Sequence, residues 1–269
     1  MENARTLGWE PVPGAHVRNR LDYLAGTDSG RLSDLNAALR DPDIDGVWCV
    51  RGGYGVLRLL ETVDYEALRR VPKPVIGFSD ITALHAAIGV KAGVISYHGP
   101  TARGTLAEFS KTSLERALVD GGNPAGAAEQ AEVLVSGAAR GRLAGGNLAV
   151  LTALTGTPFF PDLEGSILVL EDVNEPVYRI DRMLRHLRLT GALAGVAGLM
   201  FGAFTERGDD ADSVPLARLL LETAEAIGAP CVSGAPIGHL DEQWTLPLGA
   251  LAELNATDRY LTIDEPVHA

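Results

Sequence analysis

The sequence contains only two cysteines, Cys49 and Cys231, in 269 residues. Each lies in a short apolar run, which is typical of a small buried side chain. Two such residues do not make a disulfide framework or a cysteine-based metal site. We therefore predict a protein of a reducing compartment.

Basic side chains are also scarce, since 23 Lys and Arg stand against 35 Asp and Glu, for a net charge of −12. This balance argues against nucleic acid or an anionic membrane as a partner. The sequence also lacks an apolar run long enough to span a bilayer, and its first residues lack the apolar core of a signal peptide. We expect a cytoplasmic protein without nucleic-acid or membrane partners.

In the first half of the chain, strand patterns alternate with helical patterns. Short apolar runs bounded by glycine or proline predict strands at 47–50, 74–77 and 94–97. Helical spacing in the intervening segments predicts a parallel sheet with right-handed crossovers. A capping-box pattern at 112–115 predicts that the next helix begins at Thr112.

A stretch of small residues at 121–130 predicts a linker between two domains. The first would be an N-terminal α/β domain over residues 1–120, and the second would cover residues 131–269. Short strand patterns near the end of the chain favour an antiparallel or barrel-like sheet in the second domain.

Ser79 lies on a turn between the strand at 74–77 and a helical pattern that begins near Ile81. This position would expose its hydroxyl at the rim of a sheet and direct the amide of Asp80 into the same space. Serine before a helix is also a preferred N-cap, and a full nucleophile elbow would have glycine in place of Ile81. This stretch taken alone favours the cap.

A glycine loop, Arg-Gly-Gly-Tyr-Gly at 51–55, directly follows the first predicted strand. Such a loop lets backbone amides approach a phosphate, a carboxylate or an oxyanion, or it is only a tight turn that needs positive φ. The glycine spacing fits neither a Walker loop nor a dinucleotide fingerprint. Arg51 could anchor a substrate carboxylate. The loop and Ser79 both follow strands of one predicted parallel sheet, so we expect them to face one cleft.

Two further polar residues follow predicted strands in the second half. Glu171 directly follows the apolar run 166–170, so it should be the least exposed of the acidic residues there. His239 lies in a glycine- and proline-rich loop past the short strand 231–233, where the backbone places side chains. His98, in another loop, is predicted to be a surface or packing residue.

Ser79, Glu171 and His239 supply a hydroxyl, a carboxylate and an imidazole in an order found in serine hydrolases. His239 would take the proton of Ser79 and pass it to the leaving amine. Glu171 would fix the tautomer of His239 and stabilise the imidazolium.

The sequence as a whole resembles the LD-carboxypeptidases, that is, the muramoyltetrapeptide carboxypeptidases and their relative, the microcin C self-immunity peptidase. The resemblance covers roughly residues 15–265 and rests on motifs in the family's order at 51–55, 77–84, 98–100, 145–148, 170–172 with 178–184, and 238–239 before 245–249.

The resemblance implies a serine peptidase whose catalytic residues are Ser79, Glu171 and His239, with an oxyanion hole formed by the backbone amides of Gly53 and Asp80. It implies release of the terminal D-alanine from muramoyl tetrapeptides during peptidoglycan recycling, by hydrolysis of an L,D peptide bond. It also implies a Rossmann-like N-terminal domain, a smaller β-rich C-terminal domain, a cytoplasmic homodimer, and no metal or other cofactor.

One departure from the family is the start of the chain, where an extra strand and a loop containing Pro-Ser usually precede the first helix. Without that strand we expect exposed edge groups and reduced stability, with the triad intact.

Two alternative functions stay open: a self-immunity-type amidase acting on peptidyl-nucleotide analogues, and a non-catalytic module that binds muropeptides. The compact sequence after Asn147, without a long insertion, favours the cell-wall substrate.

Overall fold

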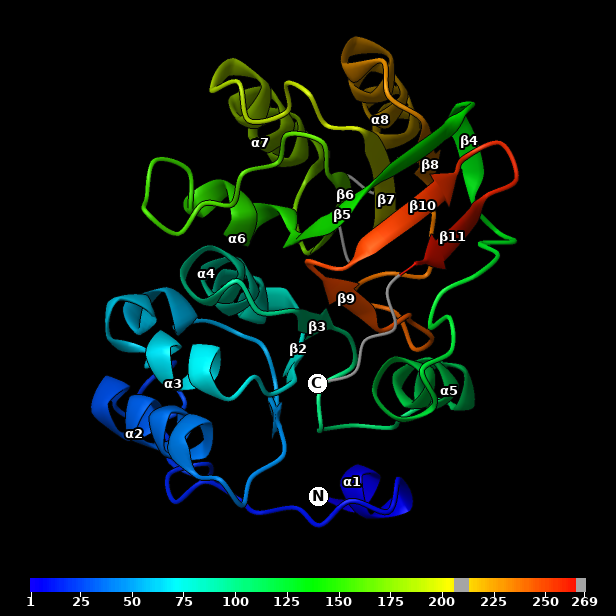
Figure 1. Ribbon diagram of the computed structural model, residues 1–269. Helices are drawn as coiled ribbons and strands as arrows, with labels where there is room; N and C mark the ends of the chain where they lie inside the picture. The colour runs from blue at the N-terminus through cyan, green and yellow to red at the C-terminus, as the bar shows by residue number, and fades with distance from the viewer. Residues whose placement is uncertain (206–212, 265–269) are drawn as a thin grey trace.

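The computed structural model describes residues 1–205 and 213–264 and shows an α/β protein with two sheets (Figure 1). A sheet of four strands lies in the lower half of the view, and a sheet of seven strands lies in the upper half. The predicted α/β class is confirmed.

The four-stranded sheet has the order β1-β2-β3-β9. Its first three strands are parallel, as predicted, and comprise β1 (Val47–Trp48), β2 (Val75–Gly77) and β3 (Ser96–His98). The helices of this half are α1 (Glu2–Thr6), α2 (Asp28–Arg40), α3 (Tyr65–Arg70), α4 (Thr82–Ala92) and α5 (Glu108–Glu115). Among the described residues, β1 pairs only with β2, so its other edge is open.

The seven-stranded sheet has a parallel centre and antiparallel edges. The parallel strands are β5 (Ala138–Asn147), β6 (Ile167–Val173), β7 (Gly198–Thr205) and β8 (Cys231–Ser233). The edges are β4 (Glu132–Val135), β10 (Leu251–Asn255) and β11 (Tyr260–Ile263). The helices of this half are α6 (Leu148–Ala153), α7 (Val177–Leu189) and α8 (Ser213–Ile227).

Apolar side chains at helical spacing explain how α7 packs. Ile180, Leu184 and Leu187 are fully buried against Leu168 and Leu170 of β6, while the arginines of the helix lie on its other faces. This packing fixes β6, the strand that carries Glu171, in the core.

The two halves of the chain are interlocked. β9 (Leu246–Leu248) comes from the second half of the sequence but pairs with β3 of the first sheet, antiparallel. Ala83 and Ala87 of α4 pack with Leu154 and Phe159 from the second half. The helix that follows Ser79 is therefore held directly against the second half.

The predicted linker at 121–130 is packed against β11. Ala127 forms a β-bridge with Tyr260, the Asn123 side chain donates to the carbonyl of Leu261, and Ala128 is buried. The division of the chain into domains at this segment stays a prediction.

The helix expected to begin at Thr112 begins at Glu108, so the capping-box prediction was wrong. The hydroxyl of Ser113 is used in a tertiary contact instead. It donates to the carbonyl of Pro124 at 2.6 Å and accepts from the Thr245 amide at 2.7 Å.

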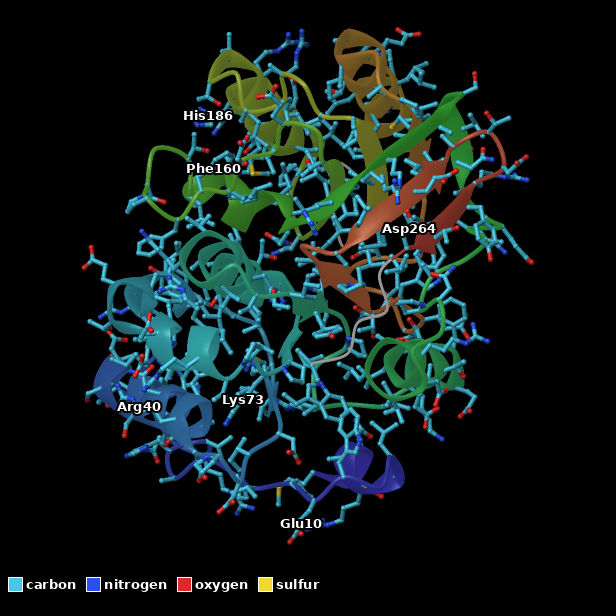
Figure 2. All side chains as sticks on the ribbon, in the orientation of Figure 1. Glu10, Arg40, Lys73, Phe160, His186 and Asp264 are labelled. Atoms are coloured by element: carbon cyan, nitrogen blue, oxygen red, sulfur yellow. The ribbon has the colours of Figure 1, made fainter. Side chains whose placement is uncertain are left out.

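A buried lysine ties the loop before β2 to the end of α2. The Nζ of Lys73, labelled in Figure 2 beside Arg40, donates to the carbonyl oxygens of Ala38 and Asp41. This contact helps to anchor the strand that leads to Ser79.

Candidate active site

Ser79 occupies the turn that follows β2 and has a backbone φ of 65°, in the left-handed region that non-glycine residues seldom adopt. It begins a short 3₁₀ helix, Ser79–Ile81, whose N-cap is Phe78 and which has no side-chain cap. The helix-cap interpretation of the Ser79 hydroxyl was therefore wrong. A strained serine at a strand-to-helix turn is the arrangement in which a nucleophilic hydroxyl is exposed at the rim of a sheet.

The glycine loop lies against this turn. A Cβ on Gly52 would lie 2.8 Å from the Cβ of Ser79, so only glycine allows so close an approach. Gly53 and Gly55 have φ values of 115° and 125°, which also require glycine. Because of this close contact, the backbone of Gly52, the residue before Gly53, lies beside the Ser79 hydroxyl.

The carboxylate of Asp80 holds the far end of that loop. Its Oδ2 accepts from the amide of Val56 at 2.9 Å, while Arg31 donates to the carbonyl of Gly55 at 3.0 Å. Burial raises the pKa of Asp80, and the hydrogen bond from Val56 opposes that shift. The Asp80 side chain thus has a structural task, which leaves its backbone amide for the role that the sequence predicts.

Arg51 is exposed at the start of the glycine loop, and its guanidinium lies near Gly53. It forms no ion pair within residues 1–205 and 213–264. An exposed, unpaired guanidinium beside an amide-lined loop is suited to bind a carboxylate.

Glu171 and His239 are in direct contact. The Nδ1 of His239 lies 2.7 Å from Oε2 of Glu171, although the two residues are 68 positions apart. The Glu171 side chain is 0% exposed and that of His239 is 23% exposed. The sequence correctly predicts that Glu171 is the least exposed acidic residue of this segment, but it ends the strand too early. Glu171 lies inside β6, where the register with β7 shifts.

Gly238 makes that contact possible. Its φ is 99°, and a Cβ at this position would overlap Oε2 of Glu171 and lie 2.6 Å from the Cβ of Glu171. The loop can bring His239 to the carboxylate only because residue 238 has no side chain.

Phe78 joins the two parts of the site. Its ring packs edge-on against the ring of His239, with centroids 4.8 Å apart, and it directly precedes Ser79. The loop after His239 is fixed as well, because Ser110 accepts from the Gln243 amide and Ser113 from the Thr245 amide. The serine turn, the glycine loop, the imidazole and the buried carboxylate therefore lie at one junction between the two halves.

The comparisons with known proteins identify the family of the chain. The profile of the LD-carboxypeptidase N-terminal domain matches residues 1–99, and that of the LD-carboxypeptidase C-terminal domain matches residues 140–254. The chain belongs to the LD-carboxypeptidase family. The family that the sequence resembles is thereby confirmed.

Among its relatives is the murein tetrapeptide carboxypeptidase of Pseudomonas aeruginosa, which is 37% identical over 90% of this chain and 82% of its own length. The structure of the muramoyltetrapeptide carboxypeptidase of Oxalobacter formigenes matches with a TM-score of 0.81 and 29% identity, over 98% of this chain and 92% of that one. The microcin C7 self immunity protein MccF matches with a TM-score of 0.87 over 100% of this chain and 90% of that one, and its 24% identity shows the shared fold.

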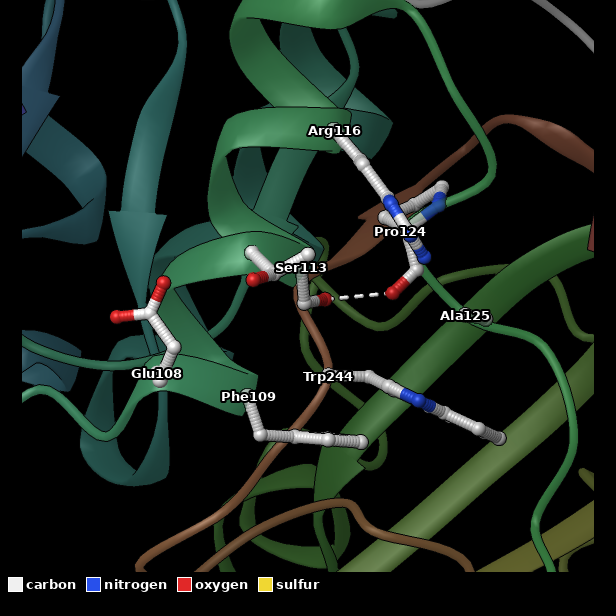
Figure 3. A pocket seen from close by; sticks show the side chains of 8 residues that line it. Glu108, Phe109, Ser113, Arg116, Pro124, Ala125 and Trp244 are labelled. Carbon is white, nitrogen blue, oxygen red and sulfur yellow. Dashed lines mark hydrogen bonds between the residues drawn. The ribbon is translucent and has the colours of Figure 1, made fainter.

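In this LD-carboxypeptidase, a separate pocket of about 340 Å³ lies between α5, the 124–125 segment and Trp244, which precedes β9 (Figure 3). Its walls include Phe109, Arg116 and Trp244, and none of the predicted site residues lines it. The bond from Ser113 to Pro124 crosses its edge in Figure 3. This pocket belongs to the scaffold that holds the His239 loop.

Two features are absent from the described residues. No helix among them has both the length and the apolar character needed to cross a bilayer. They also contain no group of three or more His, Cys, Asp or Glu placed to hold a metal ion.

Proposed function

We propose that this LD-carboxypeptidase is a serine peptidase that releases the terminal D-alanine from muramoyl tetrapeptides during peptidoglycan recycling. The observation that carries the proposal is the 2.7 Å contact between Glu171 and His239 beside the strained turn of Ser79. The names of the Pseudomonas and Oxalobacter relatives support the same substrate class.

In this mechanism the Ser79 hydroxyl attacks the carbonyl carbon of the L,D bond, and Nε2 of His239 takes its proton. The carbonyl oxygen becomes an oxyanion held by the amides of Gly53 and Asp80. His239 then protonates the leaving amine, which departs as D-alanine, and a water molecule hydrolyses the acyl-enzyme by the same route.

Glu171 supports each of these proton transfers. Its Oε2 contacts Nδ1 of His239, which leaves Nε2 as the nitrogen that can face the serine. Because Glu171 is fully buried, water does not screen its attraction for the imidazolium that forms during the reaction. Arg51 would bind the carboxylate of the departing D-alanine.

The decisive experiment compares the purified enzyme with Ser79→Ala on a muramoyl tetrapeptide. We expect the variant to lose D-alanine release by about four orders of magnitude. A serine-directed phosphonate should label the wild-type chain at Ser79, and EDTA should leave turnover unchanged. Unchanged turnover of Ser79→Ala would refute the proposal.

Because the chain is similar to MccF, we keep a second candidate function, that of an amidase acting on peptidyl-nucleotide analogues. α6 begins at Leu148, immediately after β5 ends at Asn147, so no insertion extends the site there. This compactness favours the cell-wall peptide. Turnover of both substrates by one preparation would decide between them, and binding without phosphonate labelling would indicate the non-catalytic module.

We also propose that the enzyme is a cytoplasmic homodimer, as the resemblance implies. Light scattering of the purified protein should give twice the mass of 28.4 kDa. Fractionation of cells should recover it with the cytoplasm.

A further inference from the structure

His98, the last residue of β3, is a buried polar residue next to the proposed triad. It is 0% exposed, and neither of its ring nitrogens forms a hydrogen bond with a described residue. A buried imidazole nitrogen without a partner destabilises the folded state, because it has lost its hydrogen bonds to water. The sequence-based expectation of a surface or packing residue does not account for this arrangement.

The ring of His98 lies close to the rings that surround the triad. Phe78 packs edge-on against both histidines, with centroids 6.0 Å from His98 and 4.8 Å from His239. Phe78 therefore supports an imidazole on each side. Only one of the two, His239, has a carboxylate partner.

His98 also lies at the strand junction that carries Glu171. A Cβ on Gly146 would lie 3.3 Å from Cδ2 of His98, and the next residue of β5, Asn147, pairs with Glu171 in the register of β5 and β6. The end of β3 thus meets the segment of β6 in which Glu171 lies.

Two other buried polar atoms in this region have no partner among the described residues: Oε1 of Glu171 and Oγ1 of Thr245. Thr245 precedes Leu246, which pairs with His98 in the register of β3 and β9. A Cβ on Gly99, the residue after His98, would lie 2.7 Å from Oγ1 of Thr245. Thr245 and Gly99 therefore share one face of the β3–β9 pair, while the ring of His98 lies on the other face, toward Gly146.

The electrostatic surroundings keep His98 neutral. Burial lowers the pKa of His98, the negative charge of Glu171 opposes that shift, and the nearby His239 imidazole adds to it. A neutral imidazole has one N–H donor and one acceptor nitrogen. It can thus donate a hydrogen bond toward a carboxylate.

We propose that His98 is a positioning residue for Glu171, which it holds through a buried water molecule shared with Oε1 of Glu171. Internal waters occupy such places because they satisfy several buried polar groups at once. Glu171 is then fixed through both oxygens, by His239 at Oε2 and by the water at Oε1. This proposal rests on the proposed function of Glu171 in the triad.

The test compares His98→Leu with His98→Gln in the full chain. Leucine fills the space without polar atoms, and glutamine keeps both a donor and an acceptor. We expect His98→Leu to lower kcat at least about tenfold with little change in KM, because an outer hydrogen bond that orients a site residue typically contributes 10- to 100-fold. His98→Gln should restore most of kcat.

A second pair of variants keeps the test decisive if His98→Leu does not fold. His98→Phe keeps an aromatic ring without the two nitrogens, and Thr152→Val removes an unpartnered buried hydroxyl on α6, away from His98. We expect kcat to fall for His98→Phe and to stay unchanged for Thr152→Val. A crystal structure of the wild-type enzyme should show the water between His98 and Glu171.

Phosphonate labelling of Ser79 counts active sites in each preparation and separates the two proposals. If the wild type is not labelled, the proposed function fails. If it is labelled and His98→Leu keeps the wild-type kcat per labelled site, or if His98→Gln is as impaired as His98→Leu, the positioning role fails and His98 is only a packing residue.

Discussion

Gly238 faces Glu171 so closely that a Cβ at residue 238 would overlap the carboxylate oxygen that contacts His239. Gly238→Ala must therefore displace either the His239 loop or the Glu171 side chain. A displacement of about 1 Å in a catalytic group can lower the rate about 100-fold. We expect a loss of that size in kcat/KM, measured on a muramoyl tetrapeptide.

The matched control for this change is Gly228→Ala, also at a glycine with positive φ, 73°, but with nothing within 4 Å of the added Cβ. It should lower stability by about 1–2 kcal/mol through backbone strain and leave kcat/KM unchanged. Equal activity of the two variants would contradict the steric role of Gly238.

Glu171→Gln should keep the shape of the side chain but remove the negative charge behind His239. An amide in this position can present its NH₂ to the imidazole and favour the wrong tautomer, and the equivalent change in serine peptidases lowers kcat by about 10⁴-fold. We expect a loss of this order in steady-state kinetics.

The control for this variant is Glu175→Gln, which alters a nearby acidic residue that pairs with Arg179 at 3.5 Å. Because Arg179 is largely exposed and Glu175 is partly exposed, loss of this ion pair should change stability by less than about 1 kcal/mol and leave kcat unchanged. If Glu171→Gln were as active as Glu175→Gln, Glu171 would not orient the imidazole.

Asp80→Ala should loosen the glycine loop, because the amide of Val56 loses the carboxylate oxygen that accepts its hydrogen bond at 2.9 Å. Loss of one oxyanion donor lowers kcat about 10²- to 10³-fold. Asp80→Ala keeps the donor and only makes the loop more mobile, so we expect its kcat to fall about tenfold. Asp80→Asn retains an acceptor oxygen and should lose much less. Similar kinetics for both variants would show that this hydrogen bond does not position the loop.

The raised pKa of Asp172 predicts how the free energy of unfolding changes with pH. Burial raises its pKa from 3.8 to about 6, opposed by hydrogen bonds from Val173 and Asn147. The folded state thus binds the proton of Asp172 more tightly than the unfolded state does. The stabilisation of the fold by this protonation is fully present below about pH 4 and is lost as pH rises to about 6. The difference between these pKa values corresponds to about 3 kcal/mol.

Urea unfolding of the wild type and of Asp172→Ala, at several values between pH 4 and pH 7, measures this effect. The advantage in unfolding free energy that the wild type has over the variant should shrink as pH rises through this range. An advantage that stays constant would show that Asp172 titrates at the same pH in the folded and unfolded states.

The local patterns of the sequence predicted the strands and the turns well. Val75 and Ile76 form a buried strand because an apolar run bounded by Pro74 and Gly77 has few other ways to remove its side chains from water. The helix start predicted from the capping box at Thr112 was wrong. The hydroxyl of Ser113 in that pattern instead contacts Thr245, far along the chain. Local signals cannot predict a partner 132 residues away.

The sequence by itself determined the family, the α/β class and the three residues proposed for the triad, because motif residues and apolar periods are local properties of the chain. Only the tertiary structure decided that Glu171 meets His239, that Gly238 must lack a side chain, and that His98 is buried beside them. These contacts depend on how the two sheets pack, and β9 crosses from one half of the chain to pair in the sheet of the other. Side chains from distant segments acquire their distances only when that packing is complete.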